Sequence, residues 1–416
     1  MRIVIVSAFF RPGLMYLENL LAELLPRMGH TVRVVASFDG ASHGEGGAGG
    51  PAARDDGYEI CRVPCLCLPW NFYLFSGKAA PAIRQFQPEL IVWVGPTRHF
   101  GRSFPRDPVL ADVPLVTTFS ECVGWYEFDF RKPGIALSQR LRALAYRVLR
   151  GSTVRAACRA STLIVGVTPE TTGILASLFR PGAERDAIAG KSVVLPLGFH
   201  PGITRWDPAL RQATRRELQL DPGEVVVALS SRFTRLKAGL LQTMIAGLGQ
   251  AVAREGSIRA LVIGLDDGPV SRSIRRAIAE SPRPERFVCH DFADQARLNA
   301  LYNAADIALF GNCSISVQSA MGTGLLACLA DNGTMDHLVR SPDVGVFFRT
   351  ADASDLADKL AGAAGLLAGQ SDAERLGARE RRVQDNAWLG YDRILSAMLD
   401  LGGPARPSGE EPQAPR

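Results

Sequence analysis

The sequence predicts an α/β protein made of two doubly wound domains in series. Its 416 residues are too many for one ordinary domain. In both halves, short apolar runs alternate with helical patterns, which is typical of a parallel sheet covered by helices. A Pro-Leu-Gly stretch at 196–198 separates the halves. We therefore expect a first domain over 1–196 and a second over 197–384. Open parallel sheets bind ligands at the carboxyl ends of their strands, so the two domains should face a central cleft.

The first half begins with a strand-helix-strand unit. An apolar run at 2–7 suits a strand that is buried on both faces. Leu17, Leu21 and Leu24 recur at helical spacing, Gly29 ends that helix, and a second strand follows at 31–36. Further strands are expected at 89–94, 115–119, 162–165 and 192–195. The segment 39–57 is so rich in Gly, Ala and Ser that we expect a loop without a core of its own.

The second half repeats the pattern more regularly. Strands are expected at 225–230, 260–263, 287–290, 307–310, 325–330 and 345–348. Helices between them are expected at 238–253, 270–280, 295–304, 316–323 and 353–367. Both halves are therefore Rossmann-like, with right-handed crossovers between parallel strands.

The end of the chain carries one more helical pattern. A helix over 385–400 has an apolar stripe that includes Trp388 and Tyr391, and such a stripe needs a partner surface. We expect it to pack back on the first domain. Residues 402–416 are rich in Pro, Gly and charge, which predicts a disordered tail.

Composition narrows the location and the partners. A formal charge of +5 is mild for this length, so nucleic acid is not an expected partner. The eight cysteines lack the paired CxxC spacing of a zinc site and are expected to be reduced thiols. No stretch approaches the ~20 uninterrupted apolar residues of a membrane helix. We therefore expect a cytoplasmic protein.

One segment concentrates positive charge. Between Arg131 and Arg159 the sequence has eight basic residues and no acidic one. This is either a solvated helix face or a surface that docks on an anionic acceptor or on the inner face of an anionic membrane. The sequence leaves both interpretations open.

The segment 230–239 predicts a phosphate site. It follows a strand and opens a helix, whose first backbone N–H groups and positive dipole end favour anions. Arg232 and Lys237 lie five residues apart in it and can converge on one diphosphate, Arg as a bidentate fork and Lys as a point charge. No acidic residue lies between Ser230 and Gln250 to neutralise them.

This segment resembles the "GR....KG" element of glycosyltransferase family 4. Residues 261–264, 287–291, 301–307 and 320–324 are similar to later motifs of that family in the same order, and residues 12–19 and 29–32 resemble its first loop and "GH.V" turn. The resemblance covers nearly the whole chain. It implies the GT-B fold and transfer of a hexose from a nucleotide diphosphate sugar to an acceptor hydroxyl, with retention, without metal and without a cofactor. The acceptor is left open among a glycan, a lipid-linked molecule and a small molecule.

The resemblance also implies roles for individual residues. Catalysis is expected of Arg232 and Lys237, which would stabilise the departing diphosphate. Contacts to the donor are expected from Gly264, His290, Ser314, Ser316, Gln318 and Ser319. The acceptor side is expected to include Gly13, Tyr16, Glu18, Ser120 and Glu121. A purely structural role remains open for three of these residues, because His290 can be a core histidine and because Ser120 and Glu121 can cap a turn.

The sequence departs from the family pattern at several positions. Ser319 stands where the family has a glutamate that binds the donor ribose, and the partner glutamate is missing because the loop 311–316 is shorter. Met15 replaces a glycine, and Ser120 stands where many relatives have a histidine. A neutral serine contact is weaker than a charged one by about 1 kcal/mol. Two alternatives therefore stay open: a catalytically weak GT-B homologue that binds a ligand or partner, and a sugar-nucleotide epimerase.

Overall fold

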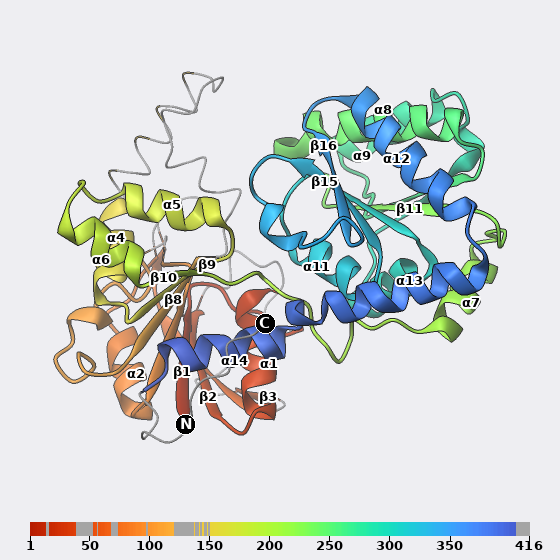
Figure 1. Cartoon of the computed structure of the whole chain (residues 1–416). Helices are drawn as coiled ribbons and strands as arrows, with labels where there is room; N and C mark the ends of the chain where they lie inside the picture. Colours follow the sequence, from red (N-terminus) through yellow and green to blue (C-terminus); the bar gives the residue numbers. More distant parts are fainter. Residues whose placement is uncertain are drawn as a thin grey trace. The chain divides into compact units, whose positions relative to one another are not determined.

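The structure is a computed structural model that describes residues 1–13, 16–38, 53–55, 57–67, 74–96, 99–119, 137, 141, 144, 148 and 150–404. The chain divides into two compact units, Met1–Leu197 with Asp392–Arg416, and Gly198–Tyr391. Each unit contains one large sheet with helices packed against it (Figure 1). Within the described ranges, no helix combines the length and the apolar character needed to cross a bilayer.

The first unit has an eight-stranded sheet in the order β10-β9-β8-β7-β1-β2-β4-β3. Its strands are β1 (Arg2–Ser7), β2 (Thr31–Phe38), β3 (Ala53–Asp55), β4 (Tyr58–Pro64), β7 (Leu90–Val94), β8 (Leu115–Phe119), β9 (Leu163–Gly166) and β10 (Ser192–Val194). All neighbours are parallel except β3 and β4. The central strands β7 and β8 are buried along their whole length, as expected for strands covered on both faces.

Helices and one small ribbon complete the first unit. The helices are α1 (Leu17–Arg27), α2 (Ala79–Phe86), η3 (Phe104–Arg106), α4 (Gly151–Ala160), α5 (Pro169–Ser177), α6 (Ala183–Gly190) and α14 (Tyr391–Gly402). The short strands β5 (Leu66–Cys67) and β6 (Leu74–Phe75) pair only with each other. Trp93 of β7 and Phe104 of η3 stack edge to face, with ring centroids 4.9 Å apart, inside the core.

The second unit has a six-stranded, wholly parallel sheet in the order β13-β12-β11-β14-β15-β16. The strands are β11 (Val225–Ser230), β12 (Ile258–Ile263), β13 (Phe287–His290), β14 (Ile307–Phe310), β15 (Leu326–Asp331) and β16 (Gly345–Arg349). The main helices are α7 (Pro208–Glu217), α8 (Ala238–Arg254), α9 (Pro269–Ala279), α10 (Gln295–Ala304), α11 (Ile315–Gly322), α12 (Ala353–Ala368) and α13 (Asp372–Asp385), with the 3₁₀ turns η5 (Arg235–Lys237), η6 (Pro284–Arg286), η7 (Asp336–Leu338) and η8 (Ala387–Leu389).

Both sheets contain a topological switch point, where the strand order reverses direction. In the first sheet the switch point lies between β1 and β7, and in the second between β11 and β14. The loops that follow such a pair of strands leave the sheet toward opposite faces, so open α/β sheets bind ligands there. The switch points thus mark where a ligand site is expected within each unit.

Two parts of the first unit differ from expectation. The segment 39–57 was expected to be a loop, but its residues 53–55 form β3, which pairs antiparallel with β4. Strand β4 was not expected either, and it adds to the parallel sheet beside β2. An alternating pattern of half-buried residues at this sheet edge gives a weaker sequence signal than a fully apolar run. The other residues between 39 and 56 lie outside the described residues.

The C-terminal helix also needs a correction. Trp388 was expected to pack on the first domain, but it belongs to the second unit, where the Arg340 guanidinium lies 3.5 Å from its ring centroid. The chain joins the first unit from Asp392 onward, and Gly402 at the end of α14 packs against Val116 and Leu163. The apolar stripe is thus divided between the units. The tail from residue 405 lies outside the described residues.

Candidate functional site

The loop after β11 places Arg232 and Lys237 at the switch point of the second sheet. Its backbone is held by hydrogen bonds from Ser231 N–H to Ile263 O (3.2 Å) and from Lys237 N–H to Thr234 O (3.0 Å). Phe233 is buried and anchors the loop, whereas Arg232 is exposed. Lys237 is half-buried, with Nζ 3.5 Å from Ser231 Oγ, and lies where η5 meets α8. Both cations therefore lie at the junction of a loop and a helix.

Gly264 lets the neighbouring loop approach this segment closely. It follows β12, has φ +100°, and a Cβ at this position would lie 2.3 Å from the carbonyl oxygen of Ser231. Only glycine fits such an approach without displacing backbone. Its N–H donates to His290 O at 3.0 Å, which ties the ends of β12 and β13 together. Gly264 thus shapes the backbone around the predicted phosphate loop.

A second loop reaches the same edge of the sheet from β14. Strands β11 and β14 pair directly, so the loop 311–314 lies beside the loop 231–237 in the sheet order. Ser314 is the extended N-cap of α11 and makes no side-chain capping bond, and Ser314 and Ser316 are both half-buried. The first-turn N–H groups of a helix have no intrahelical acceptor and lie at its positive end. The switch point therefore combines two cations with a helix terminus that favours anions.

A buried tyrosine beneath these loops was missed by sequence reasoning. Tyr302 of α10 is fully buried, and its hydroxyl lies 2.5 Å from Ser230 Oγ at the end of β11. The same hydroxyl is hydrogen-bonded to the Ser316 side chain in the first turn of α11. Burial raises the pKa of Tyr302 well above its usual range, so the phenol stays protonated. One hydroxyl thus connects the two elements that carry the predicted phosphate contacts.

Three other predicted donor residues make contacts within the second unit. His290 contacts the backbone oxygen of Asp291 through Nδ1 (3.0 Å) and accepts from Arg297 Nε through Nε2 (3.2 Å). Gln318 is fully buried, its Oε1 accepts from Gly198 N–H, and Ser319 is also buried. Their roles toward a donor remain predictions.

The first unit presents its predicted residues around the β1–α1 loop. Gly13 has φ +77° and is exposed, and Tyr16 is the exposed N-cap of α1. Glu18 lies half-buried in the first turn of α1, where burial raises its pKa to about 7. Asn19 is buried and donates from Nδ2 to Arg11 O at 2.7 Å, which fixes the loop end. Met15, Ser120 and Glu121 lie outside the described residues.

His99 is a further candidate that sequence reasoning missed. It follows β7 at the switch point of the first sheet, is 3% exposed, and its Nδ1 contacts the hydroxyl of Thr153 on α4. Its φ of +62° is uncommon for a residue with a side chain. Such conformations concentrate at functional sites. The signal in the sequence was a lone histidine just after an apolar strand and the Gly95-Pro96 turn.

The basic segment between 131 and 159 differs in part from expectation. Of its basic residues, the structure describes Arg150, Arg155 and Arg159. Arg150, the N-cap residue of α4, is buried rather than exposed, and Arg159 pairs with Glu184 at 2.6 Å. In the part of the segment before Arg150, the described residues are helical and exposed by 45% to 73%, and they are Leu137, Leu141, Leu144 and Val148. An apolar stripe at helical spacing therefore faces outward here. Farther on, Val154, Ala157 and Cys158 of α4 are buried.

The structure provides two observations on metal and redox chemistry. The described part of the chain has no group of three or more His, Cys, Asp or Glu side chains arranged to hold a metal ion. Metal independence remains a prediction. The six cysteines whose side chains are described form no disulfide with one another.

Comparisons with known proteins place this architecture. No family model matches the sequence. A curated relative, D-inositol 3-phosphate glycosyltransferase of Nocardia farcinica (strain IFM 10152), is 32% identical over 232 residues, or 52% of this chain and 47% of the relative. The chain thus spans about half the length of the curated relative it matches.

Two solved structures are similar over most of both chains. Sucrose-phosphate synthase of Thermosynechococcus elongatus has a TM-score of 0.67 at 16% identity and covers 96% of this chain and 98% of its own. HepE of Anabaena in complex with UDP-glucose has a TM-score of 0.60 at 15% identity and covers 96% and 98%. These likenesses and the two Rossmann-like sheets show that the chain has the GT-B fold of glycosyltransferases.

Proposed function

We propose that this protein is a hexosyltransferase that moves a sugar from a nucleotide diphosphate sugar to an acceptor hydroxyl, with retention and without a divalent metal. The observation that carries the proposal is the position of Arg232 and Lys237 at the second switch point, beside the N-terminus of α11. Two comparisons support it, because the curated relative is named a glycosyltransferase and the HepE structure is a complex with UDP-glucose.

The residues suggest how the reaction proceeds. The acceptor oxygen attacks the anomeric carbon from the side on which the diphosphate leaves, and the bond from that carbon to the phosphate oxygen breaks. Negative charge grows on the diphosphate, where Arg232, Lys237 and the N–H groups near Ser316 stabilise it. The acceptor proton passes to a leaving phosphate oxygen, so no separate base is required. Ser314 and Ser316 add hydroxyl donors at the same edge.

The donor is held by neutral groups where the resembling family has glutamates. Ser319 occupies that position and is buried, so a ribose contact weaker by about 1 kcal/mol is expected. Because the HepE structure is a complex with UDP-glucose, that compound is the first donor to test. D-inositol 3-phosphate is the first acceptor to test, on the name of the curated relative. A glycan or a lipid-linked acceptor stays open.

We assign the donor to the second unit and the acceptor to the first. Gly13, Tyr16 and Glu18 lie at the carboxyl edge of the first sheet, next to its switch point, which supports an acceptor role there. Ser120 and Glu121 follow β8 in the sequence and stay in the same proposal.

We also propose a cytoplasmic protein whose segment 131–159 docks on anionic lipid, since its exposed apolar residues alternate with arginines in the sequence.

Donor binding and transfer test the proposal together. Titration calorimetry with UDP-glucose should detect binding, and Arg232→Ala or Lys237→Ala should fold normally yet lose on the order of a hundredfold or more in transfer rate, or roughly 2 to 4 kcal/mol. The double variant should be little worse than the poorer single one, because both act on one leaving group. Arg235→Ala is the matched control, since Arg235 is an exposed cation in the same turn.

Each alternative outcome has a distinct meaning. Wild-type turnover in both variants would overturn the roles of Arg232 and Lys237. Failure to bind any nucleotide sugar would favour a binding protein of GT-B fold. Conversion of the donor alone into an isomer would favour an epimerase.

A further inference from the structure

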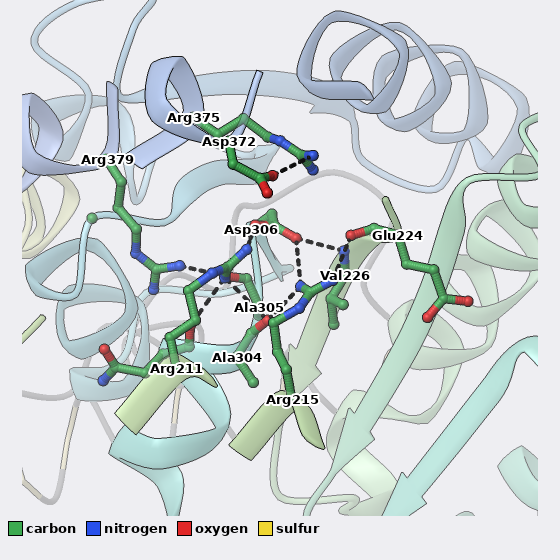
Figure 2. A network of polar contacts seen from close by, with 12 residues as sticks. Arg211, Arg215, Glu224, Val226, Ala304, Ala305, Asp306, Asp372, Arg375 and Arg379 are labelled. Carbon is green, nitrogen blue, oxygen red and sulfur yellow. Dashed lines mark hydrogen bonds and ion pairs between the residues drawn. The ribbon is translucent and has the colours of Figure 1, made fainter. Parts of the chain in front are cut away.

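Five arginines surround a single buried carboxylate in the second unit. They come from α7 and α13 and are Arg211, Arg215, Arg375, Arg379 and Arg382. The carboxylate is Asp306, which directly precedes β14 (Figure 2). Asp306 exchanges backbone and side-chain hydrogen bonds with Val226 near the start of β11. This arginine cluster therefore lies at the amino edge of the sheet, opposite the loops of the proposed donor site.

Asp306 neutralises only part of this charge. Its Oδ1 lies 2.6 Å from Arg211 Nη2, and its Oδ2 lies 3.3 Å from Arg215 Nη1. Burial alone would raise the pKa of Asp306, but Arg211 and Arg215 outweigh it and hold that pKa below its usual range, so the group is ionised. Glu224 is also nearby, but it pairs with Arg286 at 2.8 Å. Asp306 is thus the one buried carboxylate in the described residues that pairs directly with arginines of this cluster, and it faces five guanidinium groups.

Two more of the arginines, Arg379 and Arg382, donate hydrogen bonds to backbone carbonyl oxygens. Arg379 donates to the carbonyl oxygens of Tyr302, Ala305 and Thr323 at 2.6 to 2.8 Å. Arg382 donates from Nε to Gly324 O at 2.8 Å. These oxygens lie at the C-terminal ends of α10 and α11, where cations are favoured. The two side chains have a structural role that needs no ligand.

Arg375 has no such set of backbone acceptors within the described residues. Its Nη2 reaches Asp372 Oδ1 at 2.9 Å, but the Asp372 side chain is 73% exposed, whereas that of Arg375 is 12% exposed. Its Nε and Nη1 are buried and make no hydrogen bond within the described residues. A buried donor without an acceptor costs roughly 1 to 3 kcal/mol, and a buried charge needs a counter-charge. The structure therefore leaves two buried donors of Arg375 without an acceptor, and the carboxylate that pairs with its third nitrogen is solvent-exposed.

The space beside Arg375 limits the size of that acceptor. It is a cavity of about 10 Å³ lined by Arg211, Arg375, Arg379 and Asp306 together with Leu367 and Leu376. Such a volume has room for one water molecule or one monatomic ion. A tetrahedral oxyanion with four oxygens needs more room. Water would satisfy the donors but would leave the excess positive charge in place.

We propose that the arginine cluster binds one small monovalent anion, chloride, beside Arg375. The ion accepts from the unpaired Nε and Nη1 donors and reduces the repulsion among the guanidinium groups. It thereby stabilises the ends of α10 and α11 that Arg379 and Arg382 hold. This chloride site is separate from the proposed diphosphate site. The chloride proposal therefore does not depend on whether the protein transfers sugar.

Thermal unfolding of the full chain tests the site. Sodium chloride is exchanged for sodium gluconate at fixed ionic strength, because gluconate is too large for the cavity. Above the dissociation constant, each tenfold rise in chloride should add 1.4 kcal/mol to the second unit's stability, a rise of about 3 to 6 °C in its Tm. Sulfate should give no such specific increase.

Variants separate binding from general salt effects. Arg375→Met should lose the chloride response and should melt at or above the wild type in gluconate, because the repulsion is relieved. Arg349→Met is the matched control: Arg349 also pairs with an aspartate three residues away, Asp352, but is 71% exposed. It should keep the full response. Arg375→Lys serves as a second variant if the methionine variant does not fold.

Diffraction gives a reading that needs no variant. Crystals of the full chain soaked in bromide should show an anomalous peak within about 3.5 Å of Arg375 Nε or Nη1. An ordered water there without a peak, a wild type that responds equally to chloride and gluconate, or an Arg375→Met protein that keeps the response would overturn the proposal.

Discussion

At the scale of single residues, Gly264 shows how a missing side chain positions a functional loop. A methyl group there would meet the Ser231 carbonyl oxygen at 2.3 Å, and the φ of +100° strains any other residue. We expect Gly264→Ala to cost about 2 kcal/mol or more of unfolding free energy. It should also weaken UDP-glucose binding, since the backbone that carries Arg232 must move. Chemical denaturation and calorimetry measure the two effects.

The control for this substitution is a glycine in open space. Gly362 lies inside α12, and a Cβ added at this position would have no neighbouring atom within 4 Å. Gly362→Ala should therefore leave donor binding unchanged and raise stability by about 0.5 to 1 kcal/mol. Equal effects of the two substitutions would contradict the packing argument.

Glu18 predicts a pH dependence in the first unit. Burial raises its pKa to about 7, whereas an unfolded glutamate titrates near 4.3. Between these values the folded state holds a proton that the unfolded state has lost, so stability falls as pH rises through this window and levels off above about 7. Glu18→Gln should remove this penalty, which we put at about 1 to 3 kcal/mol at pH 8 and near zero at pH 4.

Urea unfolding of both proteins at several pH values measures the difference. Glu280→Gln, at an exposed glutamate at the end of α9, gives the background effect of losing one carboxylate. If Glu18 binds the acceptor, the pH profile of transfer should also lose a limb near 7 in the Gln variant. A stability gain that does not depend on pH would contradict a raised pKa.

At the scale of elements, Tyr302 links β11, α10 and α11 through one hydroxyl. Tyr302→Phe keeps the packing and leaves Ser230 and Ser316 without their shared partner. We expect a loss of about 1 to 3 kcal/mol in the stability of the second unit and a severalfold weaker affinity for UDP. A double-mutant cycle with Ser230→Ala should give a coupling energy of about 0.5 to 1.5 kcal/mol. A coupling of zero would mean that the hydroxyl contact contributes nothing.

Most elements of the second unit could be predicted from local pattern. Strands β11, β13 and β14 and helix α10 have the bounds that the sequence indicates. For β11 and β14 the reason is that strands buried on both faces are continuous apolar runs. Helices α7 and α13 were missed. Both are rich in arginine, and their buried arginines contact carbonyl oxygens distant in the sequence. Local hydrophobic pattern does not encode such contacts.

At the scale of the whole molecule, the segment 131–159 predicts binding to membranes. Vesicles containing phosphatidylserine should sediment the protein at low salt, and binding should fade as salt rises, because each cation near the surface contributes about 1 kcal/mol that salt screens. Leu141→Glu should reduce binding by placing charge in the exposed apolar stripe. Leu366→Glu is the matched control in the second unit, at a leucine that is 75% exposed against 59% for Leu141. Absence of binding by the wild type at low salt would leave a solvated face.

The sequence by itself determined the two parallel sheets and the place of Arg232 and Lys237. Apolar runs, helical periodicity and a cation pair after a strand involve residues that are close together in the sequence, so the sequence alone reveals them. The tertiary structure alone decided which carboxyl ends meet at a switch point and that Gly264 closely approaches Ser231. It also decided that Tyr302 lies beneath the loops of the second unit and that His99 is buried against Thr153 in the first. It also gathered arginines from α7 and α13 around Asp306. These facts depend on contacts between residues far apart in the chain, whose energies arise only when burial removes the groups from water.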